Sequence, residues 1–110
     1  MLTLVGCEVE RTPSILTPLA SDEDVTLVAI RTSRDDPAFR TVFSMGSQWK
    51  LIGRTSKGEV YKPLGGGLNV TGVNSYEAYA VVNGGYLIGY WMPHDQSFAG
   101  EDPIEIRFSR

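Results

Sequence analysis

One stretch decides the fold, and it reads Val81-Val82-Asn83-Gly84-Gly85-Tyr86-Leu87-Ile88-Gly89-Tyr90-Trp91-Met92-Pro93. It is the densest apolar and aromatic run of the chain. Asn-Gly-Gly supplies residues that tolerate positive φ, which a tight hairpin turn requires. The residues on both sides are mostly β-branched or aromatic and therefore favour strands. The stretch predicts a β-hairpin whose second strand belongs to the core.

The composition predicts one globular, soluble domain spanning residues 1–110, a common domain length. Hydrophobic residues make up 42% and charged residues 21%, which argues against disorder. Twelve glycines and six prolines separate short apolar runs, as in proteins built from many strands and turns. We therefore expect a mostly β fold: a single antiparallel sheet, small barrel or sandwich of about seven strands, with at most one or two short helices.

The other expected strands follow from short apolar or alternating runs. The clearest is the last, in which Ile104, Ile106 and Phe108 alternate with polar residues. Residues 11–24 are expected to be a long loop or an irregular edge, because they contain two prolines. Residues 94–102 are expected to be a polar loop. The remaining expected strands are 1–9, 25–32, 48–55, 59–62 and 68–73.

Two segments allow both helix and strand. In residues 33–46, the aspartates, Pro37 and Gly46 favour a capped helix, whereas β-branched residues favour a strand leading into a hairpin, which we narrowly prefer. In residues 75–82, Ser75 could cap a helix, but tyrosines and valines followed by Asn-Gly-Gly favour a strand. If both segments were helical, the domain would be a compact α+β fold.

Strict alternation along 86–92 predicts two apolar faces. Tyr86, Ile88, Tyr90 and Met92 would form one face, and Leu87, Gly89 and Trp91 the other. Gly89 would mark a bulge, a large residue packed across it, or the close approach of a ligand.

Aromatic residues are the main candidates for a binding site. Tyrosine and tryptophan combine apolar area with a polar tip, so they suit interfaces and pockets as well as cores. We expect a binding face formed by Trp49, Tyr86, Tyr90, Trp91 and His94. The competing interpretation is that these aromatic rings simply pack in the core.

The function that these residues predict is a non-enzymatic binding domain for a protein partner or an apolar small molecule. A homo-oligomer is compatible with the same aromatic surface. The net charge of −3 favours no nucleic acid, and no run is long enough for a transmembrane helix. With one cysteine and one histidine, we expect neither a metal site nor a cofactor.

Two alternatives depend on Cys7. Leu4-Val5-Gly6-Cys7 has the form of a bacterial lipobox, which would make the chain an envelope lipoprotein tethered through Cys7. Only six residues precede Cys7, so this hypothesis requires a start further upstream; otherwise a cytoplasmic location is the default. A less favoured hypothesis is an enzyme in which His94 activates the Cys7 thiol.

Overall fold

The predicted hairpin is present in the computed structural model, which describes residues 11–32, 37–65, 69–71 and 75–109. Strand β7 (Tyr79–Asn83) and strand β8 (Tyr86–Met92) pair antiparallel around a two-residue turn. Gly84 and Gly85 in this turn have φ values of 59° and 85°. A two-residue hairpin turn of type I′ requires positive φ at both turn residues. The turn signal of the sequence is thus confirmed.

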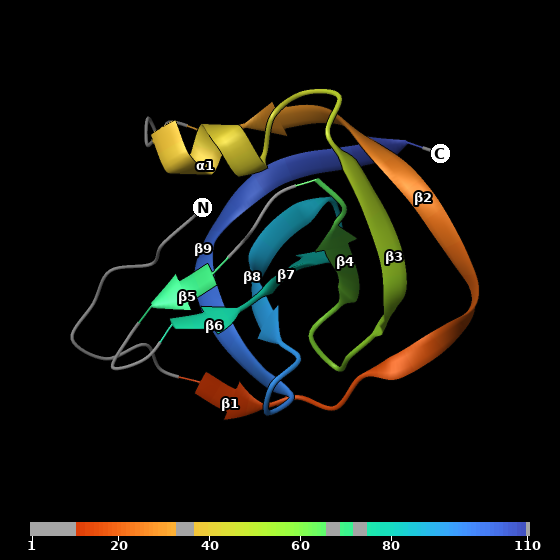
Figure 1. Cartoon of the computed structure of the whole chain (residues 1–110), viewed down its shortest axis with the longest axis vertical. Helices are drawn as coiled ribbons and strands as arrows, with labels where there is room; N and C mark the ends of the chain where they lie inside the picture. The colour runs from red at the N-terminus through yellow and green to blue at the C-terminus, as the bar shows by residue number, and fades with distance from the viewer. Residues whose placement is uncertain (1–10, 33–36, 66–68, 72–74, 110) are drawn as a thin grey trace.

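Seven of the described strands form one antiparallel sheet in the order β1-β9-β2-β3-β4-β7-β8. An additional pairing of β8 with β9 closes six of them into a ring, and β1 pairs with β9 outside it (Figure 1). The predicted mostly β fold, with a small barrel, is confirmed. The remaining elements are β1 (Arg11–Pro13), β2 (Thr17–Arg31), α1 (Pro37–Val42), β3 (Gln48–Arg54), β4 (Glu59–Pro63), β5 (Asn69–Thr71), β6 (Ser75–Glu77) and β9 (Ser97–Ser109).

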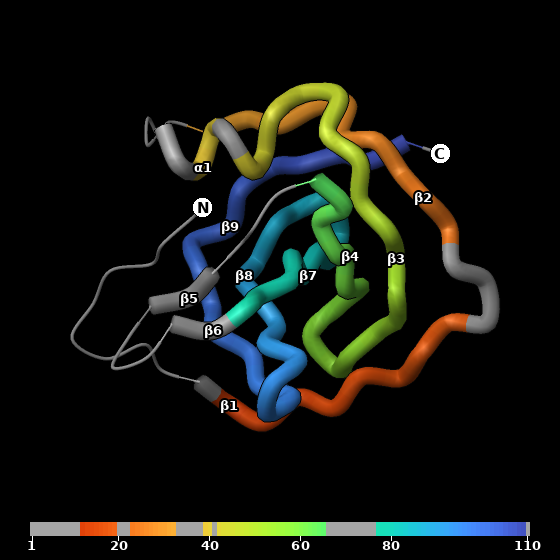
Figure 2. The backbone as a smooth tube through the Cα atoms, viewed as in Figure 1, coloured from red at the N-terminus to blue at the C-terminus, as the bar shows by residue number. Residues whose placement is uncertain are grey.

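Strand β9 pairs with β2 over only part of its length. This ladder joins Thr26–Arg31 to Glu105–Ser109. At its other end β9 pairs instead with β1, through Ser97–Ala99. Accordingly, β2 and β9 run side by side near α1 and diverge towards β1 (Figure 2). Residues far apart in the chain therefore meet where β2 and β9 pair.

The larger hydrophobic cluster fills the interior of the barrel. It takes side chains from all six strands of the ring and from α1, which only an enclosed space allows. Aromatic rings connect its parts: Phe43 stacks on Trp49 at 5.1 Å between ring centroids, and Tyr61 on Phe108 at 4.4 Å. Burial of such large rings is a major source of the folding free energy.

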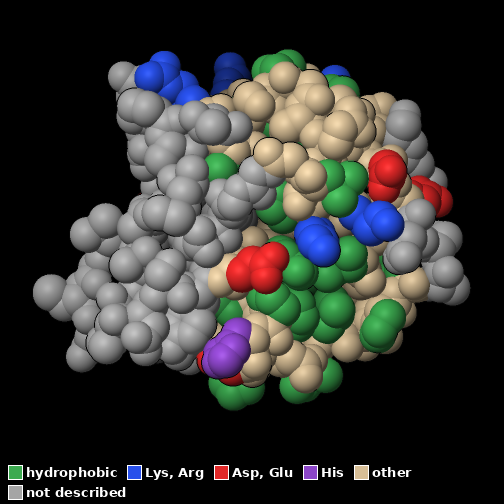
Figure 3. Space-filling model, viewed as in Figure 1, with side chains coloured by type: hydrophobic (Ala, Val, Ile, Leu, Met, Phe, Trp, Pro, Cys, Tyr) green, Lys and Arg blue, Asp and Glu red, His purple; other side chains and the backbone are tan. Residues whose placement is uncertain are grey.

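A second cluster lies on the opposite face of the strands. Its buried members are Val60, Tyr79, Val81 and Trp91, with Leu16, Ile52, Ile88 and Phe98 packed against them. Alternation along β7 explains the division, because Ala80 and Val82 belong to the interior cluster. On the face that Figure 3 shows, hydrophobic side chains gather at the centre with charged side chains around them. The β-strands are therefore apolar on both faces.

Residues 37–42 are a helix, so the narrow preference for a strand between residues 37 and 45 was wrong. The Phe43 amide donates to the Phe39 carbonyl, and the two rings stack at 4.6 Å. Phe39, Val42 and Phe43 are buried whereas Arg40 is exposed, which is the i, i+3, i+4 pattern of a helix packed on a core. Gly46, with a φ of 86°, lies four residues beyond the helix end, in the turn that leads to β3. Tertiary packing of the two phenylalanines outweighs the β-branched residues.

The predicted polar loop at residues 94–102 is largely strand, and for residues 11–24 the irregular edge, not the long loop, is present. The polar connection is limited to residues 93–96, and β9 already begins at Ser97. The segment 11–24 contains β1 and the first part of β2, which is irregular between Pro18 and Glu23 where the register with β3 shifts. The hydrogen-bond partners of these strands are distant in sequence. The polar and proline-containing composition of the two segments therefore did not indicate that they form strands.

The alternation predicted along β8 breaks at Ile88. The register with β7 and with β9 shifts there, which is the mark of a β-bulge. Leu87 consequently shares the barrel interior with Tyr90 and Met92, whereas Ile88 and Trp91 lie on the outer face. One extra residue moves the first part of the strand to the opposite face.

The other segments mostly follow the sequence. Residues 75–83 form the strands β6 and β7, as favoured over a helix, so the α+β alternative is not adopted. In β9, Ile104 and Ile106 are buried while Glu105 and Arg107 are exposed, which confirms the predicted alternation. Strands β3 and β4 lie close to their expected ranges, and the strand expected at 1–9 falls outside the described residues.

Candidate binding groove

Three of the five expected site residues are buried. Trp49 and Tyr90 have no exposed surface, and Trp91 is 4% exposed. Trp49 and Tyr90 belong to the interior cluster, and Trp91 to the outer cluster. These three side chains therefore do not share one surface, and in this structure they pack rather than line a cavity.

Each buried aromatic residue has a partner for its polar tip. The Trp49 indole donates to the Ser47 hydroxyl at 2.9 Å, and the Tyr90 hydroxyl donates to a Glu101 carboxylate oxygen. The Trp91 indole donates to the Ser14 carbonyl at 2.7 Å. Satisfied polar tips are what core packing of tyrosine and tryptophan requires.

The bond from Trp91 fixes the segment between β1 and β2 against the outer cluster. The Ser14 amide donates to the Gln96 carbonyl at 2.8 Å, and the Leu16 amide to the Gln96 side-chain oxygen at 3.3 Å. Gln96 itself has a φ of 50°, an uncommon value outside glycine. The β8–β9 turn and residues 14–16 thus hold one another in place.

The two exposed site residues lie at opposite ends of β8. Tyr86, at the start of the strand, is 45% exposed. His94 is exposed in the turn that follows the end of the strand. Cys7 lies outside the described residues, so its acylation and its pairing with His94 stay predictions.

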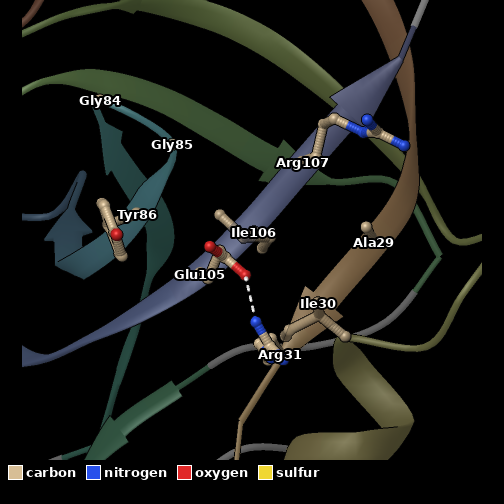
Figure 4. Close-up of a pocket in the computed structure, with 9 residues that line it drawn as sticks. All are labelled: Ala29, Ile30, Arg31, Gly84, Gly85, Tyr86, Glu105, Ile106 and Arg107. Carbon is tan, nitrogen blue, oxygen red and sulfur yellow. Dashed lines mark ion pairs between the residues drawn. The ribbon is translucent and has the colours of Figure 1, made fainter.

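Tyr86 borders a groove of about 500 Å³. The groove crosses three strands and the hairpin turn, as Figure 4 shows. Its volume is within the range of ligand sites. It is lined by Ala29, Ile30, Arg31, Gly84, Gly85, Tyr86, Glu105, Ile106 and Arg107.

Strand register places the exposed side chains of the groove in two neighbouring rows. In the first row, Glu105 of β9 stands between Tyr86 of β8 and Arg31 of β2. In the next row, Arg107 of β9 stands opposite Ala29 of β2. On the other side of β9 the glycine turn approaches, because the Ile106 amide donates to the Gly85 carbonyl at 3.0 Å. The hollow exists because alanine and glycine stand where longer side chains would fill the space.

The charged side chains of the groove are exposed and loosely held. Arg31 and Glu105 form an ion pair at 3.9 Å, with side-chain exposures of 87% and 54%. An exposed pair of this kind contributes little to stability. Within the described chain, the Arg107 guanidinium has no ion pair, and it points away from the Arg31–Glu105 pair (Figure 4). Among its described residues, the groove therefore has one positive charge without an ion-pair partner.

Sequence reasoning found Tyr86 but missed the charged residues beside it. Alternation did place Glu105 and Arg107 on the outward face of the last strand. Arg31 stood at the end of another predicted strand, and nothing local indicated that the two strands pair. The strand register supplied that information.

The described residues contain no group of histidine, cysteine, aspartate or glutamate side chains that could hold a metal ion. No described helix is long and apolar enough to cross a membrane. No protein-family model, curated protein sequence or solved structure matches the chain.

Proposed function

We propose that this protein is a non-enzymatic binding domain that holds a segment of a protein partner in the groove beside Tyr86. The observation that carries the proposal is a hollow of about 500 Å³ bordered by a tyrosine that is 45% exposed. Tyrosine is enriched in protein interfaces because it offers a large rigid surface and a polar hydroxyl.

The lining favours recognition over chemistry. Its nine described residues include no serine, threonine, cysteine or histidine, so among them there is no pair of a hydroxyl or thiol nucleophile and an imidazole base. The one carboxylate of these nine residues, that of Glu105, lies 3.9 Å from Arg31. The aromatic, guanidinium and backbone groups that remain are those of a docking surface.

A peptide segment suits the groove better than an enclosed small molecule. Pockets for small ligands usually bury most of the ligand surface. Here the walls include Tyr86 and Arg31, whose side chains project into solvent. Such walls can cover one or two side chains of a partner and leave the rest of that segment in water.

The test is an NMR titration with end-blocked tetrapeptides that carry a central leucine, phenylalanine or tryptophan. We expect at least one of them to shift the backbone amides of residues 29–31, 84–86 and 105–107 in a saturable way. Tyr86→Ala should weaken this binding about tenfold or more, as the loss of an anchoring aromatic side chain does.

The matched control is Ile15→Ala, which truncates a residue that is 67% exposed and does not line the groove. Both variants should keep the wild-type circular dichroism, because neither side chain is buried. Shifts that avoid the groove, or that are the same in wild type and Tyr86→Ala, would contradict the proposal.

A further inference from the structure

We propose that the groove recognises an acidic side chain of the partner segment, whose carboxylate binds above Ala29 between Arg107 and Arg31. This inference rests on the proposed function, because it specifies what the groove holds. It commits to an acidic peptide segment, and the reason is the arrangement of charge around Ala29.

Ala29 is the small residue around which the two arginines are placed. Arg107 stands directly opposite it on β9, and Arg31 is two residues along β2. Cβ atoms of opposite residues are about 5 Å apart, and residues i and i+2 of a strand are about 7 Å apart on the same face. The small alanine side chain thus leaves a gap with a guanidinium on two of its sides. Figure 4 shows Ala29 between the two arginines.

The described lining of the groove has more positive than negative charge. It contains two guanidinium groups and one carboxylate, that of Glu105, which lies 3.9 Å from Arg31. The described lining thus has an excess positive charge, although the whole chain has a net charge of −3. A local charge opposite to that of the whole protein favours an anionic partner over a cationic one.

Both guanidinium groups are available as far as the described residues are concerned. Within the part of the chain that the structure describes, Arg107 has no ion pair. Among the same residues, Arg31 has only the long, exposed contact with Glu105, which an incoming carboxylate can replace at little cost. Arginine presents a planar fork of donors that fits a carboxylate through two hydrogen bonds.

The position of Ala29 is also within reach of the aromatic wall. Ala29 and Tyr86 belong to β2 and β8, on either side of β9, and their partners on β9 are Arg107 and Glu105, two residues apart. Adjacent strands are about 4.8 Å apart and residues i and i+2 about 7 Å apart, so the two positions are separated by about 12 Å. An extended peptide covers this distance in about three to four residues. The expected partner sequence therefore has an acidic residue about three to four positions from an apolar one, with the apolar side chain against Tyr86.

The test is an NMR titration with two peptides, acetyl-Glu-Ser-Gly-Phe-amide and the same peptide with glutamine in place of glutamate. In the wild type, the glutamate peptide should bind about tenfold more tightly, as expected for a charge-assisted pair. Arg107→Gln should reduce this preference to about twofold or less, and Arg31→Gln should reduce it in part. The control is Arg54→Gln, which removes an exposed arginine of β3 that pairs with Glu59 and lies outside the groove.

The outcomes separate this inference from the function on which it rests. Equal affinities for the two peptides, with groove amides shifted by both, would overturn the acidic preference and leave the binding function standing. No shift of groove amides by these peptides or by the apolar tetrapeptides would overturn both. In a competition experiment, inorganic phosphate and N-acetylglutamate could displace the glutamate peptide at the same concentration, and the phenylalanine of the peptide could add no affinity. This result would show a site for small anions and overturn the peptide assignment.

Discussion

Gly89 provides the sharpest test of the packing between β8 and β9. A Cβ atom at this position would lie 2.3 Å from the Ala99 carbonyl oxygen and 2.7 Å from the ring of Phe98. The oxygen belongs to the backbone of the paired strand, so it cannot move away without breaking the ladder. The φ of Gly89 is not positive, so lack of space and not backbone strain is the cause. Gly89→Ala should therefore destabilise the protein by about 3 kcal/mol.

The matched control is Gly100→Ala. Gly100 is the cross-strand partner of Gly89, and a Cβ there would meet nothing closer than 3.6 Å. Its φ is also not positive, so alanine should be neutral or stabilise by about 0.5 kcal/mol through the unfolded state. The two variants thus compare the same substitution at paired positions of neighbouring strands, where the space for a Cβ atom differs.

The assay is urea unfolding followed by tryptophan fluorescence. With an m-value of about 2 kcal/mol/M, the expected loss lowers the midpoint of Gly89→Ala by about 1.5 M. Gly100→Ala should keep the wild-type midpoint or raise it slightly. Equal midpoints for the two variants would refute the packing of Phe98 and Ala99 across Gly89.

Two further predictions concern the outer cluster. Trp91→Phe leaves the buried Ser14 carbonyl without its donor. We therefore expect the free energy of unfolding to fall by about 1–3 kcal/mol and amide exchange to become faster in residues 14–16. Unchanged stability in urea would contradict this role of Trp91. Burial, and then the charge and hydrogen bond of Glu77, raise the pKa of Tyr79 above 10.0. A raised pKa means that the unfolded state loses this proton first, so the stability contribution is complete below pH 10 and is lost as the pH rises through the folded pKa. Tyr79→Phe should show a shallower fall in urea midpoint above pH 10 than the wild type, and an identical fall would count against this assignment.

The parts of the fold that could be predicted are those with strong local signals. The Asn-Gly-Gly turn has to adopt positive φ, and few residues other than glycine and asparagine do so readily. The alternation of Ile104 and Ile106 with Glu105 and Arg107 has the period of a half-buried strand. In both cases the physical cause lies within a few residues, so it is visible in the sequence.

The errors share one cause, which is that distant partners decided the outcome. The helix α1 forms because Phe39 stacks on Phe43, which in turn stacks on Trp49 in the interior cluster. The first part of β9 is a strand because β8 and β1 pair with it. The bulge at Ile88 exchanges the faces of β8, and neither β-propensity nor alternation indicates where an extra residue is inserted.

By itself, the sequence determined the fold class, the hairpin and the outward position of Glu105 and Arg107. Only the tertiary structure decided that Trp49, Tyr90 and Trp91 are buried, that Tyr86 is exposed, and that Arg107 stands opposite Ala29, two residues from Arg31. Composition shows how much aromatic surface a chain has, but not which part of it folding removes from water. The groove depends on the closure of β2 against β9, a pairing between residues more than seventy positions apart in the chain.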